Sequence, residues 1–132
     1  CHASGGDSNP LGPDLAKLGK VTDQHVIESL LEPSKSIRKG YETYSVLTSQ
    51  GDVLSGLKLS EDDRSLTMRL ASDLTSETRI DKDDIERIKL NPKSLMPEGL
   101  EQNLTPDEMN DLVSFIKNWR YLDGAIPLQE CP

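Results

Sequence analysis

The spacing of apolar residues changes twice along this chain, and that change limits the folds it can adopt. Residues 22–31 have helical spacing, and Thr22 is a typical N-cap residue. From about residue 42 the apolar period becomes two, and from about residue 105 the helical period returns. The sequence therefore predicts helical segments on either side of a small antiparallel β unit that covers roughly residues 41–90.

The period-two region divides into several short strands. "ETYSVLTSQGDVLSGLKL" has two β-prone runs around Ser49–Asp52, which is typical of a hairpin. "SLTMRLA" places Leu66, Met68 and Leu70 on one face, and "SETRI" is a further strand candidate. "DKDDIERIKL" begins with acidic residues, so it predicts one helical turn before another extended piece.

The last helix has a clear start and a clear apolar face. Thr105, Pro106 and Glu108 form a capping box with proline at the first helical position. Beyond them lies one apolar stripe, formed by Met109, Leu112, Val113 and Ile116.

Length and charge exclude some classes of function. The chain has 132 residues, which is the size of one ordinary domain, and a net charge of −8. That charge repels a phosphate backbone, so no nucleic-acid partner is expected. No stretch approaches the roughly 20 apolar residues that span a bilayer, so no transmembrane segment is expected. No leader peptide is visible, so we expect a mature product or an excised domain.

Cys1 and His2 match the last two letters of C-x-x-C-H, the attachment motif of a c-type haem. Such a site needs a thiol, an adjacent histidine and a second axial ligand, which is often methionine. The histidine also needs an acceptor for its other ring nitrogen. Gly12-Pro13 lies a short loop away, so we expect the Pro13 carbonyl to accept that N–H.

Three methionines are candidates for the second axial ligand. Met68 and Met109 lie on apolar faces of predicted elements, which favours core packing. Met96 lies between Pro92 and Pro97 in a loop, where no periodic face explains it. Met96 is therefore the candidate ligand.

Several segments together resemble the haem-binding, cytochrome-c-type domain of planctomycete and verrucomicrobial proteins. They are "GPDL" at 12–15, "ESLLEPSKSI" and "GYETY" within 28–44, "DIE" at 84–86, and "SLMPEGL" and "LTPDEMNDLVSFI" within 94–116. The resemblance covers roughly residues 1–118. It implies that Cys1 forms a thioether to a covalent haem c, that His2 and Met96 are the axial ligands, and that Pro13 and Leu15 lie against the haem.

The resemblance also implies a fold and a domain boundary. We expect an α+β chain in which a cytochrome-c-like helical domain, residues 1–118, is interrupted by the β unit at about 41–90. Residues 119–132 are expected to be a C-terminal tail. The first cysteine of C-x-x-C-H and the helix before it are missing, so the stripe on the last helix is expected to lack that helical partner. Three alternatives follow: the sequence starts inside the motif, another chain supplies the missing part, or this form carries no haem.

The resemblance implies electron transfer rather than catalysis of a substrate reaction. Such a domain is expected in the periplasm or another exported setting, within a larger oxidoreductase. Because the chain is acidic, its redox partner is expected to present a basic patch.

A different class of function remains open for the same opening segment. A mature bacterial lipoprotein begins with a lipid-modified cysteine followed by small polar residues, and "CHASGGDSNP" fits that pattern loosely. The chain would then be a haem-free or lipid-anchored binding module.

The acidic groups at 61–63 and 81–84 lack the ligand spacing of a calcium loop, which favours solvated turns. Cys131 is interpreted as a surface thiol or half of a disulfide.

Overall fold

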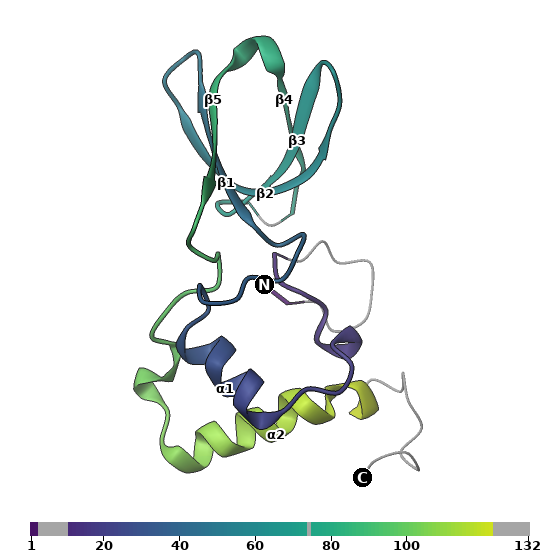
Figure 1. Cartoon of the computed structure of the whole chain (residues 1–132), viewed down its shortest axis with the longest axis vertical. Helices are drawn as coiled ribbons and strands as arrows, with labels where there is room; N and C mark the ends of the chain where they lie inside the picture. The colour runs from purple at the N-terminus through teal and green to yellow at the C-terminus, as the bar shows by residue number, and fades with distance from the viewer. Residues whose placement is uncertain (3–10, 74, 123–132) are drawn as a thin grey trace. The chain divides into compact units, whose positions relative to one another are not determined.

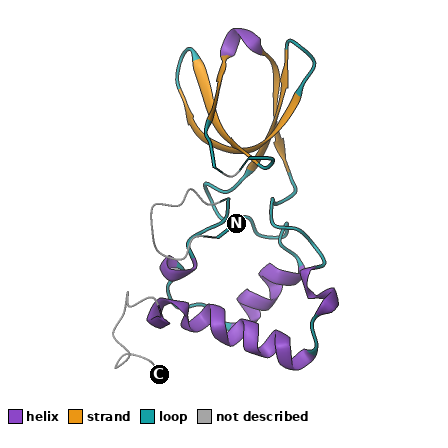
Figure 2. Cartoon of the chain, turned by 180° about the vertical axis from the view of Figure 1, so that it is seen from behind, coloured by secondary structure: helices purple, strands orange, loops and turns teal. Residues whose placement is uncertain are grey.

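The computed structural model (Figure 1) describes residues 1–2, 11–73 and 75–122, and for residues 120–122 it describes the backbone alone. The chain divides into two compact units. The sheet unit contains Ile37–Leu95, and the helical unit combines Cys1–Ser36 with Met96–Pro132. Figure 2 shows the strands in the first unit and the α-helices in the second.

The sheet unit is one antiparallel sheet of five strands. In chain order they are β1 (Thr43–Thr48), β2 (Val53–Glu61), β3 (Ser65–Leu70), β4 (Thr78–Asp81) and β5 (Ile85–Asn91). Their order in the sheet is β4-β3-β2-β1-β5, so the last strand pairs with the first. In that pairing Thr43, where β1 begins, lies opposite Asn91, where β5 ends. The two chain ends of the sheet are therefore neighbours.

A short 3-10 helix, η2 (Lys82–Asp84), joins the two edge strands β4 and β5. The Lys82 backbone N–H donates to the Arg64 carbonyl at 2.8 Å, just before β3. The Ser49 N–H donates to the Asp84 carbonyl at 2.8 Å, just after β1. Because the chain passes directly from one edge strand to the other, the sheet curls, and Figure 2 shows η2 at one end of the curl.

The core of the sheet unit consists of Val46, Leu66, Met68 and Ile80, all buried. Leu66 and Met68 follow the predicted period of two, and the Cα of Leu66 is paired with that of Ile80 on β4. Gly56 on β2 lies opposite Leu70 on β3. A Cβ added to Gly56 would lie 2.0 Å from the Arg69 carbonyl oxygen. Strand β2 therefore accepts no side chain at this position without moving β3.

The helical unit contains α1 (Asp23–Leu31), α2 (Pro106–Leu122) and the 3-10 helices η1 (Leu15–Lys17) and η3 (Leu100–Asn103). The Thr22 hydroxyl caps α1 by accepting from the His25 N–H at 3.2 Å. The predicted capping box of α2 is confirmed: the Glu108 N–H donates to the Thr105 hydroxyl, and the Thr105 N–H donates to the Glu108 carboxylate at 2.8 Å. The bond from the Thr105 N–H, followed by a second bond from the Thr105 hydroxyl to the same carboxylate at 2.9 Å, lowers the pKa of Glu108.

Helices α1 and α2 pack on each other through Val26, Leu30 and Val113, which are all buried. Around this cluster lie the partly buried side chains of Val21, Ile27, Met96, Met109, Leu112 and Ile116. The stripe on the last helix, expected to lack the helix that precedes C-x-x-C-H, instead packs on α1.

The predicted fold class, a cytochrome-c-like helical domain interrupted by a β unit, is wrong. The structure is mostly a five-stranded antiparallel sheet with two short helices, which makes it a small β-rich domain. The physical reason is that the sheet buries a hydrophobic core of its own. It therefore forms a separate folded unit rather than an insertion in a helical domain. In addition, α2 continues to Leu122, past the predicted boundary at residue 118. Residues 123–132 of the predicted tail lie outside the described residues.

We expect Leu66→Ala to lower the free energy of unfolding by about 3 kcal/mol, because the side chain is fully buried and its removal leaves a cavity. Leu59→Ala is the matched control, since Leu59 on the adjacent strand is 37% exposed. Its expected cost is below about 0.5 kcal/mol. Urea unfolding followed by far-UV circular dichroism measures both, and equal losses would contradict the assignment of this core.

Candidate functional site

The backbone brings the first two residues beside the segment that follows Leu11. The Gly12 N–H donates to the Cys1 carbonyl at 2.9 Å. Leu11 is buried, whereas Cys1 and His2 are exposed. The hydrogen bond and the buried leucine together hold the Gly12-Pro13 peptide next to the histidine.

The His2 ring is oriented by the Pro13 carbonyl. The Nδ1 atom of His2 lies 2.7 Å from the Pro13 carbonyl oxygen. A carbonyl only accepts, so the ring donates through Nδ1–H, and in the neutral imidazole the lone pair then lies on Nε2. The predicted hydrogen bond is therefore confirmed. A ring held in this tautomer presents Nε2 as a metal ligand or a base.

The position of the His2 ring leaves no room for a side chain at residue 12, so glycine fits there. A Cβ at residue 12 would lie 2.6 Å from Cε1 and 2.8 Å from Nδ1 of His2. The imidazole therefore occupies the space that a side chain at position 12 would fill. Sequence reasoning selected Gly12 only as part of a turn before Pro13, and the close approach of the ring had no local indication in the sequence.

The chain turns into η1 directly after Pro13. The Asp14 carboxylate accepts from the Ala16 N–H at 3.0 Å and so caps the first turn. Leu15, predicted to lie against a cofactor, is partly buried on η1, and η1 contacts α2. This contact anchors the His2–Pro13 segment to the helical core.

Met96 lies in the helical unit together with Cys1 and His2. Its side chain is partly buried and packs against the cluster of Val26, Leu30 and Val113. Three residues on, Gly99 has a φ of +81° and precedes η3. Glycine adopts this left-handed conformation without strain, so the "MPEGL" segment turns sharply here.

Cys1, His2 and Met96 have the side-chain types that the predicted haem site requires, and all three belong to the helical unit. Cys1 has a free, exposed thiol, which is the group that forms a thioether. His2 has one ring nitrogen engaged and the other available. Met96 supplies a thioether sulfur from the same unit. Cys131 lies outside the described residues.

Protein-only metal sites find no support in the described part of the chain. There, no group of three or more His, Cys, Asp and Glu side chains could hold a metal ion. The acidic residues near η2 serve other roles: Glu61 accepts from Lys58 at 3.0 Å and from Lys82 at 3.1 Å, and these contacts lower its pKa. Asp62 accepts from the Arg64 and Ser65 N–H groups, which lowers its pKa. The predicted turn is found at residues 62–64, whereas Glu61 ends β2, Asp81 ends β4 and residues 82–84 form η2.

Membrane-spanning helices are also absent from the described ranges, where no helix is long and apolar enough to cross a bilayer. No protein-family model matches the chain, and no curated protein matches it.

We expect Gly12→Ala to displace the His2 ring and to break its hydrogen bond to Pro13, because the new Cβ overlaps the imidazole. Long-range 15N NMR spectra report the tautomer of each histidine. The wild-type His2 signals should indicate Nδ1–H, and the variant should show a mixture. His25, exposed on α1, is the internal control and should not change. An unchanged His2 tautomer in the variant would refute the role of Gly12.

Proposed function

We propose that this chain transfers electrons through one c-type haem that is held by Cys1 and His2. The observation that carries the proposal is the 2.7 Å contact between His2 Nδ1 and the Pro13 carbonyl. A haem ligand needs its second ring nitrogen engaged in this way, because that hydrogen bond sets the tautomer and raises the basicity of the coordinating nitrogen.

Each candidate residue has a separate role in this proposal. The Cys1 thiol would form a thioether to the haem, and His2 Nε2 would be a ligand of its iron. Gly12 leaves room for the ring, and Pro13 holds its orientation. Met96 is the distal ligand, while Leu15 contributes apolar surface from η1. The haem supplies a one-electron redox couple, whose potential depends on its axial ligands and its burial.

The proposal rests on these residues and not on a cytochrome fold. Cys1, His2, Pro13 and Met96 all belong to the helical unit, which has its own apolar cluster. Free Cys1 is also what a lipid anchor would require, so a lipid-anchored or haem-free binding module is the competing outcome.

The biological setting is part of the same proposal. Covalent haem attachment places the chain in the periplasm or another exported compartment, as a domain of a larger oxidoreductase. The electron partner presents a basic patch.

We expect protein matured in a host that exports and attaches haem to have an intact mass increased by one haem. The reduced protein should show a c-type visible spectrum. His2→Ala should lose that spectrum, and Cys1→Ala should lose the covalent adduct. A diacylglycerol adduct would establish the lipid-anchored alternative, and a chain with neither adduct would overturn both.

A pair of methionine variants tests the distal ligand. Met96 and Met109 are partly buried on the same apolar cluster, so Met96→Ala and Met109→Ala should each cost about 1–3 kcal/mol of stability. Only Met96→Ala should remove the methionine–iron absorption and lower the midpoint potential. If both holoproteins keep the wild-type spectrum and potential, Met96 is not the ligand.

A further inference from the structure

The net charge of the chain is divided very unequally between the two units. The helical unit has five Lys and Arg residues against twelve Asp and Glu residues. The sheet unit has ten against eleven. Nearly all of the net charge of −8 therefore belongs to the helical unit.

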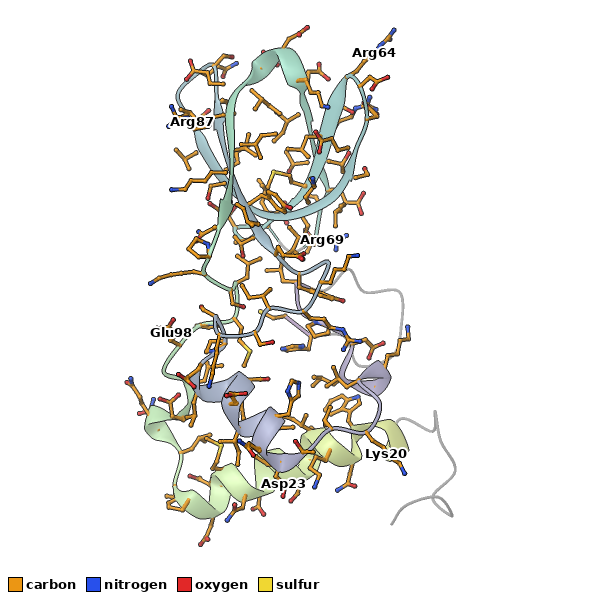
Figure 3. The ribbon with its side chains drawn as sticks, viewed as in Figure 1. Lys20, Asp23, Arg64, Arg69, Arg87 and Glu98 are labelled. Atoms are coloured by element: carbon orange, nitrogen blue, oxygen red, sulfur yellow. The ribbon has the colours of Figure 1, made fainter. Side chains whose placement is uncertain are left out.

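Within the helical unit the acidic residues concentrate around η3 and the start of α2. No Lys or Arg occurs between Lys93 and Lys117. The same stretch contains five carboxylates, at Glu98, Glu101, Asp107, Glu108 and Asp111. Glu101 is half-buried and the other four are exposed. Figure 3 shows Glu98 on the loop before η3, at the edge of the helical unit.

Three large apolar side chains are exposed on the same elements. Leu100 on η3 is 47% exposed, and Leu104, directly after η3, is 37% exposed. Leu31, the last residue of α1, is 43% exposed, and α1 contacts η3. Lys35, which follows α1, is engaged by Glu28 and Glu32. We call these three leucines and the five carboxylates the acidic face.

The charge and the exposed apolar side chains of the acidic face indicate which kind of partner it binds. Single exposed leucines are ordinary, but several exposed leucines on adjoining elements with a rim of one charge sign have the make-up of a docking surface. An anionic membrane, a nucleic acid and the helical unit of a second copy all carry negative charge that this rim repels. A protein surface with Lys or Arg around an apolar patch is complementary in both respects.

We propose that the acidic face docks a protein that presents Lys or Arg side chains around an apolar patch. The apolar contacts supply affinity, and the carboxylates supply orientation and a fast, salt-dependent association. This inference adds to the proposed function the surface that such a basic partner meets. Its test does not require bound haem, so a failure of either one leaves the other intact.

The test uses the full chain and two labelled peptides of equal positive charge. One is an amphipathic helix of lysine and leucine, and the other has serine in place of leucine. Fluorescence anisotropy should show about tenfold tighter binding of the leucine peptide. The double variant Leu100→Ser/Leu104→Ser should lose about fivefold for the leucine peptide and little for the serine peptide. Glu98→Gln/Asp107→Asn should weaken both peptides and flatten the salt dependence.

Matched controls lie in the sheet unit. Leu59 and Leu90 are 37% and 54% exposed, so Leu59→Ser/Leu90→Ser removes comparable apolar surface. Asp63→Asn/Asp83→Asn removes two exposed carboxylates. Both controls should bind within about twofold of wild type, with folding of every variant verified by circular dichroism. Equal losses in the controls would overturn the proposal. Dimerisation that Leu100→Ser/Leu104→Ser abolishes, seen by light scattering, would assign the face to a second copy instead.

Discussion

The packing of α2 on α1 is the contact on which the helical unit depends. Val26 and Leu30 come from the first part of the chain, and Val113 comes from the last part, with the whole sheet unit between them in sequence. Their burial is what joins the two segments. The candidate site uses both segments, because His2 belongs to the first and Met96 packs on this same cluster from the second. A loss of α1–α2 packing would therefore remove the contact that joins the segment with His2 to the segment with Met96.

The two units differ in net charge. In the sheet unit basic and acidic residues nearly balance, and Glu61 accepts hydrogen bonds from both Lys58 and Lys82. Exposed pairs of this kind add little to stability, but they leave the sheet close to neutral. The helical unit has a large excess of acidic residues. An approaching cation is therefore attracted to the unit that also contains Cys1 and His2.

Local chemistry in the sequence was sufficient to predict the elements and part of the site. Thr22 and Thr105 mark the helix starts, because the hydroxyl of an N-cap residue accepts a hydrogen bond from a free N–H of the first turn. This interaction is local, so it does not depend on how the helix packs. The Pro13 carbonyl was predictable as the partner of His2 because both lie in one short segment. The pairing of β5 with β1 depends on residues more than 30 positions apart in the chain, and no local pattern indicates it. The fold class was wrong for a related reason: periodicity identifies strands, but it does not show that they close a core of their own.

The pairing of Thr43 with Asn91 has a consequence for how the chain folds. Because these two residues are strand neighbours, the sheet begins and ends at one place. Once the sheet has formed, the long connection between Ser36 and Met96 acts as a short tether made of residues 37–42 and 92–95. Short loops cost less chain entropy to close than long ones. The sheet thereby shortens the effective loop that must close before α1 and α2 can meet.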